Sequence, residues 1–211
     1  TDDPRVAGLI AVGSMAERDY APDQWSDHDF FVITDPGGQE AFRTDLSWLP
    51  RADEIVLSFR ETAHGLKVVY ADGHLLEFAV FDLDETALAG VNRYRVLIDR
   101  DGVLEARMAE LAARPKREET DEHLFGMAVT AALVAAGRAP RGEVLSGTFF
   151  AVWAAKHVCA LLARHLLSER AGILDDLDPL RRFELAHPEL GAELDAALRL
   201  APPEAARRLL D

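Results

Sequence analysis

Residues 12–34 read VGSMAERDYAPDQWSDHDFFVIT, and this stretch constrains the fold more than any other. It ends in the apolar run FFVI, which is typical of a buried strand, yet Asp27 and Asp29 precede that run. Because alternate residues of a strand share a face, the two aspartates should lie side by side, with His28 packed on the opposite face. Two adjacent carboxylates repel each other and are costly to bury, so the pattern predicts a cation between them.

The residues before this strand add a second feature. Residues 5–12 predict a strand, and Gly13-Ser14 ends it, with Ser14 as the candidate N-cap of a short helix. Backbone N–H groups at a helix start can hold a phosphate, glycine permits close approach, and serine adds a hydroxyl donor. An isolated Asp-x-Asp is usually a solvated strand end. In this context it indicates a site for Mg²⁺ and a phosphorylated substrate.

A third carboxylate lies in a later apolar run, residues 74–81 (HLLEFAVF). Strand periodicity places Glu77 on the face of Leu75 and Ala79. A charged group in the middle of such a strand is otherwise expensive, so Glu77 is predicted to complete the metal site. The alternative is an edge strand on which Glu77 faces solvent.

The remaining segments divide the chain into two regions. The first half shows further strand signals, a hairpin signal at residues 71–73 and one helix, whereas the second half shows Ala- and Leu-rich helical patterns only. Strands are predicted over residues 54–59, 66–70, 74–81 and 94–99, and helices over residues 39–48, 118–136, 143–168, 178–186 and 188–200. We therefore expect an α+β chain with domains at residues 1–115 and 116–211.

Composition excludes some classes of function. The chain of 211 residues has 37 acidic and 23 basic residues, a formal net charge of -14, which repels polyanions and argues against a nucleic acid partner. The single cysteine, Cys159, lies in an apolar run and is predicted to be buried and reduced. Because we find neither a run of about 20 apolar residues nor a signal-peptide pattern, we expect no membrane partner and a cytoplasmic location.

Gly13-Ser14, Asp27, Asp29 and Glu77 together resemble the motif of the nucleotidyltransferase superfamily typified by DNA polymerase beta. The helical second half is similar to that of the small aminoglycoside and lincosamide nucleotidyltransferases. The resemblance implies a mixed β-sheet flanked by helices, followed by an all-helical C-terminal bundle. It also implies that the two aspartates hold two Mg²⁺ ions with ATP as co-substrate, that Gly13 and Ser14 hold phosphate, and that Glu77 is a metal ligand or general base.

A triphosphate needs cationic groups as well. Lys156 is the preferred candidate because its surroundings, FFAVWAAKHVCALLA, are so apolar that a lysine there requires a reason. Nearby aromatic residues predict either a stacking wall or a helical core. Other candidate cations are less specific: Arg18, Arg43, Arg51, Arg60, Lys67, Arg164, Arg181 and Arg182.

The predicted activity is Mg²⁺-dependent transfer of AMP from ATP to a hydroxyl of a small molecule, with release of pyrophosphate. The resemblance favours an aminoglycoside-type or lincosamide antibiotic as acceptor, hence a role in antibiotic resistance, and the acidic loops suit a cationic acceptor. One alternative is an antitoxin-type nucleotidyltransferase that adenylylates a protein. Another is a non-catalytic nucleotide-binding regulatory protein. The sequence leaves the oligomeric state open.

Overall fold

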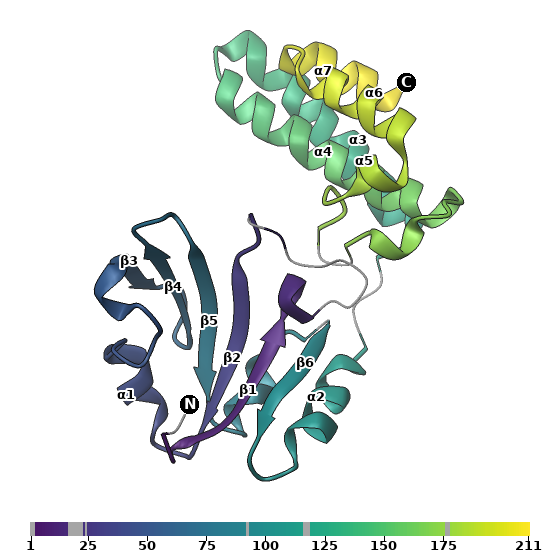
Figure 1. The fold of residues 1–211 in the computed structure, drawn as a ribbon. Helices are drawn as coiled ribbons and strands as arrows, with labels where there is room; N and C mark the ends of the chain where they lie inside the picture. The colour runs from purple at the N-terminus through teal and green to yellow at the C-terminus, as the bar shows by residue number, and fades with distance from the viewer. Residues whose placement is uncertain (1–2, 17–22, 24, 92, 116–118, 176–177) are drawn as a thin grey trace. The chain divides into compact units, whose positions relative to one another are not determined.

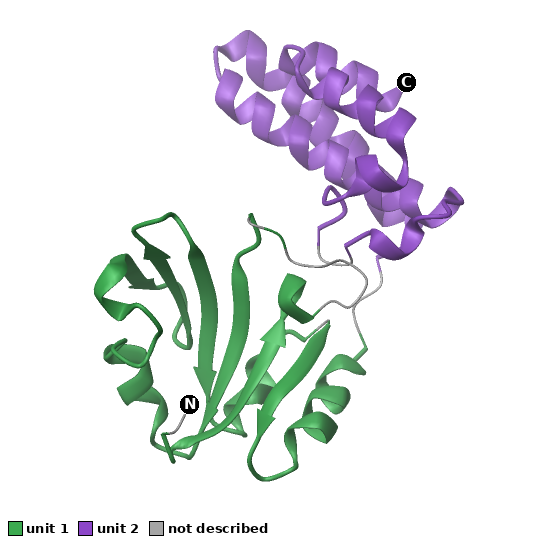
Figure 2. Cartoon of the chain, in the orientation of Figure 1, with its two compact units in different colours: residues 1–115 green, residues 116–211 purple. Residues whose placement is uncertain are grey.

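The computed structural model describes residues 3–16, 23, 25–91, 93–115, 119–175 and 178–211. The chain divides into two compact units, residues 1–115 and 116–211 (Figure 2).

Unit 1 is built on one six-stranded sheet (Figure 1). Its strands are β1 (Val6–Val12), β2 (His28–Thr34), β3 (Ile55–Arg60), β4 (Gly65–Tyr70), β5 (Leu75–Phe81) and β6 (Tyr94–Asp99), in the spatial order β3-β4-β5-β2-β1-β6. All neighbouring strands are antiparallel except β2 and β5, which run parallel. Strand β5 is therefore an interior strand, which removes the edge-strand alternative for Glu77.

Each face of the sheet carries its own hydrophobic core. Helix α1 (Gln39–Thr44) packs Phe42 against one face, together with residues such as Val32 and Phe78. Helix α2 (Leu104–Ala112) packs Met108 against the other face, where Ile33 and Phe81 are buried. Asp29 shares the strand parity of Ile33, and Glu77 shares that of Phe81. Both acids therefore lie on the α2 face, nearer the N-terminal ends of their strands.

Short 3₁₀ helices connect these elements: η1 (Gly13–Ala16), η2 (Ala52–Glu54) and η3 (Glu85–Leu88). Ser14 lies inside η1, and its hydroxyl caps no N–H group in the part of the chain that the structure describes, so the predicted N-cap is wrong. The helix predicted over residues 39–48 ends at Thr44, because Asp45 is already extended.

Unit 2 is helical. It contains α3 (Asp121–Arg138), η4 (Ala139–Arg141), α4 (Val144–His165), η5 (Ala171–Ile173), α5 (Phe183–Ala186), α6 (Pro188–Leu198) and α7 (Pro202–Leu210). Its core consists largely of alanines, which let α3, α4 and α7 approach closely. The helix predicted over residues 178–186 is reduced to α5, because Arg182 adopts a left-handed conformation with φ of 65°.

Helix α4 is long and apolar enough to cross a membrane, by length and composition only, although the sequence pattern predicts no span. It packs against α3 and α7, and core helices of soluble proteins have the same character, so this single helix is weak evidence for a span. The predicted fold class is confirmed: a mixed sheet flanked by helices is followed by a helical region.

Candidate active site

The register of the sheet aligns the key side chains in one row. Asp29 of β2 pairs with Glu77 of β5, Glu77 pairs with Lys67 of β4, and Lys67 pairs with Phe59 of β3. Residues paired across neighbouring strands point to the same face, so this row crosses four strands on the α2 side of the sheet. The parallel β2–β5 pair thus brings together two acids that are 48 positions apart in the sequence.

Three carboxylates converge at this row. Asp27, Asp29 and Glu77 each offer an oxygen, and the three oxygens lie within 4.8 Å of one another. All three residues are half-buried. Carboxylate oxygens at this spacing suit a hard divalent cation such as Mg²⁺, which also offsets their mutual repulsion. The structure therefore brings together the three residues that the sequence nominates as metal ligands.

Gly13 closes one side of this cluster. Its φ is +56°, a left-handed conformation that favours glycine, and a Cβ at this position would lie only 2.4 Å from Oδ2 of Asp29. Any larger residue would displace the carboxylate. The glycine is thus required by close approach as well as by backbone conformation.

Ser14, the next residue, is buried, and its Oγ has no hydrogen-bond partner among the described residues. A buried hydroxyl without a partner costs free energy, which is typical of a group that binds something absent from the free protein. A four-residue 3₁₀ helix aligns few peptide dipoles, so the macrodipole argument for phosphate binding is weak here. The Ser14 hydroxyl is therefore a better indication of phosphate binding than the helix dipole.

Lys67 contacts the third carboxylate directly. Its Nζ lies 2.9 Å from Oε1 of Glu77 and 3.0 Å from Oε1 of Glu61, which follows β3. These hydrogen bonds, that to Glu77 first, raise the pKa of Lys67 above its usual value, so the ammonium stays charged. From the sequence alone, Lys67 was only one of several scattered candidate cations.

His28 lies on the opposite face, as expected. A ring nitrogen of His74 lies 3.0 Å from Nδ1 of His28, and the two rings pack edge to face. Burial, and then the neighbouring His74, lower the pKa of His28, which favours the neutral imidazole. The two histidines link the beginning of β2 to the residue before β5, on the face of the sheet opposite the carboxylates.

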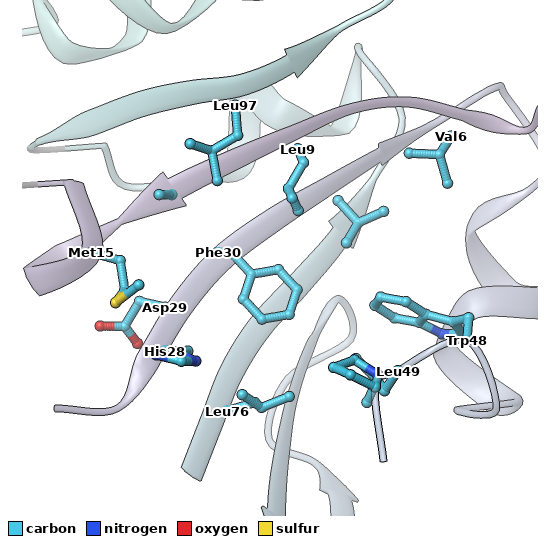
Figure 3. A pocket seen from close by; sticks show the side chains of 13 residues that line it. Val6, Leu9, Met15, His28, Asp29, Phe30, Trp48, Leu49, Leu76 and Leu97 are labelled. Carbon is cyan, nitrogen blue, oxygen red and sulfur yellow. The ribbon is translucent and has the colours of Figure 1, made fainter. Parts of the chain in front are cut away.

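A cavity of about 260 Å³ also borders Asp29 (Figure 3). Figure 3 shows the sulfur of Met15 close to the Asp29 carboxylate at one end, with Phe30 and Trp48 farther along. The remaining walls are mainly aliphatic, including Leu9, Leu49, Leu76 and Leu97. Among the described residues that line this cavity there is no lysine or arginine, so they offer little to attract a phosphate.

The other predicted cations occupy varied positions. Lys156 belongs to unit 2, where its Nζ lies 3.5 Å from Oδ1 of Asp178 and its side chain is 43% exposed. Arg43 is used structurally, since it donates to the Val80 carbonyl and pairs with Glu85. Arg51, Arg60, Arg164 and Arg181 form ion pairs with acids, Arg182 donates to the Ile173 carbonyl, and Arg18 falls outside the described residues.

One cation that sequence reasoning missed lies beside the Gly-Ser turn. Arg95 of β6 donates from Nη2 to the carbonyl of Met15 at 3.1 Å. Strands β1 and β6 are far apart in the sequence and pair so that Arg95 lies opposite Ala11. No local sequence pattern therefore indicates that Arg95 lies beside the Gly13-Ser14 turn.

Comparison with known proteins adds two similar structures. No family model matches the chain, and no curated protein matches it. A nucleotidyltransferase-like protein from Exiguobacterium sibiricum is 15% identical, with a TM-score of 0.36, over 98% of this chain and 67% of that chain. An aminoglycoside 6-adenyltransferase from Bacillus subtilis is 12% identical, with a TM-score of 0.32, over 99% of this chain and 80% of that chain.

Proposed function

We propose that this protein is a nucleotidyltransferase that moves AMP from ATP to a hydroxyl group of a small molecule and releases pyrophosphate. The observation that carries the proposal is the convergence of Asp27, Asp29 and Glu77 beside the Gly13-Ser14 turn. A hydroxylated antibiotic of the aminoglycoside or lincosamide type is the proposed acceptor, and the negative net charge favours a cationic one. The proposed location is the cytoplasm.

The three carboxylates would hold Mg²⁺. The donor set fits, because it consists of hard oxygen atoms within 4.8 Å of one another and Gly13 leaves room for the Asp29 carboxylate. When bound, divalent ions supply Lewis-acid stabilisation of the phosphoryl group and of both the attacking and the leaving oxygen. Glu77 would serve as the third ligand or accept the proton of the attacking hydroxyl.

Neighbouring groups would orient the triphosphate. Ser14, whose hydroxyl has no partner within the described part of the chain, would donate to a phosphate oxygen, and the Gly13 backbone permits close approach. Arg95, hydrogen-bonded beside this turn, would offset phosphate charge. The assignment of Lys156 to the triphosphate stays a prediction, and we expect Lys156→Met to raise the KM for ATP.

The direct test is pyrophosphate release from ATP and Mg²⁺, with and without a panel of aminoglycosides and lincosamides. Release that requires one acceptor and disappears in Asp27→Asn would establish the reaction and its acceptor class. Asp53→Asn, at an exposed position of the same unit, is the matched control and should behave like the wild type. Tight Mg-ATP binding without release across the panel would favour a protein acceptor or a regulatory binder. The absence of Mg-ATP binding would refute the proposal.

A further inference from the structure

Lys67 occupies a position that the proposed reaction does not yet explain. Its ammonium touches Glu77, a candidate metal ligand, and so puts a positive charge beside the place where a cation should bind. A lysine in this position would ordinarily weaken metal binding. Glu61 offsets that effect, because it pairs with the same ammonium at 3.0 Å.

Glu61, Lys67 and Glu77 form a network of two ion pairs across the surface of the sheet. The Lys67 side chain is 26% exposed, Glu77 is 34% exposed, and Glu61 is 52% exposed, so the contacts lie at a partly desolvated edge of the candidate site. Glu61 is anchored by its position, since its backbone N–H donates to the Gly65 carbonyl at the turn between β3 and β4. The β3–β4 hairpin thus presents one negative charge to Lys67, and β5 presents the other.

We infer that Lys67 is a positioning residue and resident counter-ion of the candidate metal site, and that Glu61 sets how strongly Lys67 competes with the metal. Without metal, the ammonium offsets the repulsion among Asp27, Asp29 and Glu77 and keeps the Glu77 side chain in place. When a divalent cation binds, Lys67 shifts its pairing toward Glu61. This inference rests on the proposed metal site.

Substitutions of the two ion-pair partners Lys67 and Glu61 should change the Mn²⁺ affinity in opposite directions. Lys67→Met removes the competing charge and should tighten Mn²⁺ binding about three- to tenfold. Glu61→Gln leaves the ammonium to Glu77 alone and should weaken Mn²⁺ binding by a similar factor. In Lys67→Met/Glu61→Gln no ammonium is left for Glu61 to hold, so the affinity should stay close to that of Lys67→Met.

A second readout concerns the protein without metal. Lys67→Met leaves four neighbouring carboxylates without their counter-ion, so its metal-free Tm should fall by several degrees. Saturating Mn²⁺ should recover most of that loss, because the metal then supplies the missing charge. A merely structural lysine would give a loss that metal does not repair.

The experiment is a titration of the 211-residue chain with Mn²⁺ in the absence of nucleotide, with the free ion measured by electron paramagnetic resonance. Arg207→Met is the matched control, since Arg207 also bridges two acids, Glu204 and Asp211, but on α7. Arg207→Met should leave the Mn²⁺ affinity unchanged. Lys67→Arg, which keeps the charge, should stay close to the wild type.

The outcomes separate the two claims. If the wild-type protein binds no Mn²⁺, the metal site itself is wrong and the role of Lys67 fails with it. If the wild type binds Mn²⁺ but Lys67→Met binds it equally or less tightly, only the counter-ion role fails. The counter-ion role would also be overturned if Lys67→Met and Glu61→Gln weakened Mn²⁺ binding equally and the double variant weakened it further.

Discussion

Ser14 is buried, and its hydroxyl has no hydrogen-bond partner among the residues that the structure describes. Ser14→Ala should leave the free energy of unfolding unchanged or raise it by about 1 kcal/mol, because the variant loses an unsatisfied polar group. The same change should raise the KM for ATP about tenfold through loss of a phosphate hydrogen bond. Urea denaturation and steady-state kinetics measure the two effects.

Thr86 provides the comparison for Ser14. It is also buried, but its Oγ1 donates to the Leu83 carbonyl at 2.5 Å and accepts from Arg107 at 3.0 Å. Thr86→Val should therefore cost about 1–3 kcal/mol of stability and leave the KM for ATP unchanged. A Ser14→Ala variant that is destabilised like Thr86→Val would show that the Ser14 hydroxyl is structural.

The close approach of Gly13 to Asp29 allows a similar comparison. Gly13→Ala and Gly73→Ala both place alanine at positive φ, +56° and +85°, and should each lose about 1 kcal/mol of stability. Of the two, only at Gly13 does the new Cβ meet a carboxylate, since no atom of the described residues lies within 4 Å of a Cβ at Gly73. We therefore expect Gly13→Ala to weaken Mn²⁺ binding at least tenfold and Gly73→Ala to bind like the wild type. Calorimetric titration measures both affinities, and equal affinities would argue against a metal at Asp29.

Some residue contacts at the site were within reach of the sequence, and others were not. The hairpin signal at residues 71–73 is sufficient to pair Val69 with Leu75, and two more steps along each strand pair Lys67 with Glu77. The turn was predicted, but the pairing of Lys67 with Glu77 that follows from it was not. By contrast, the pairing of Asp29 with Glu77 depends on a parallel contact between distant strands, which no local pattern sets.

At the scale of elements, strands were predicted better than short helices. The runs that form β4, β5 and β6 were located to within about two residues, because alternation and turn residues mark their ends. Helices α2 and α7 were missed although both carry a helical signal. In α2, Leu104, Met108 and Leu111 are buried at helical spacing, and α7 begins with Pro202 at its first position.

Helix α4 predicts a pH dependence of stability. Burial is the main cause that lowers the pKa of His157 below 6.5, and its Nε2 has no partner among the described residues. The unfolded chain therefore binds a proton at a higher pH than the folded protein does. Stability from this residue is present above pH 6.5 and is lost as the pH falls from 6.5 toward the lowered pKa, below which the loss levels off.

His157→Leu should therefore reduce, but not abolish, the fall in Tm between about pH 7 and pH 5, since His28 contributes in the same direction. Thr148→Val, at an exposed position on α4 that carries no titratable group, is the control and should retain the wild-type slope. Thermal scans at several pH values measure both. An unchanged slope in His157→Leu would mean that His157 is not held neutral by the fold.

At the scale of the whole molecule, the two units differ in the kind of chemistry they carry. The candidate metal ligands and the Gly-Ser turn all belong to unit 1, whereas the single cysteine, Cys159, is buried in unit 2. Burial raises the pKa of the Cys159 thiol to about 12, which makes it a structural rather than a reactive group, as its apolar sequence context predicted. The residues of the sequence motif thus all lie in the first 115 residues.

The net charge of -14 adds a long-range field to these local features, and it predicts a dependence on salt. Mn²⁺ binding should weaken several-fold as KCl rises from about 10 to about 200 mM, because the Debye length then falls from about 30 Å to below 10 Å. ATP without a divalent ion should bind weakly, and its affinity should not fall with salt, since screening reduces the repulsion between ATP and the acidic protein. Fluorescence titrations with Mn²⁺ and with metal-free ATP at the two salt concentrations measure both trends. A metal-free ATP affinity that drops with salt would instead reveal a basic triphosphate site strong enough to overcome the acidic field, and the carboxylates would then not be the principal means of binding the nucleotide.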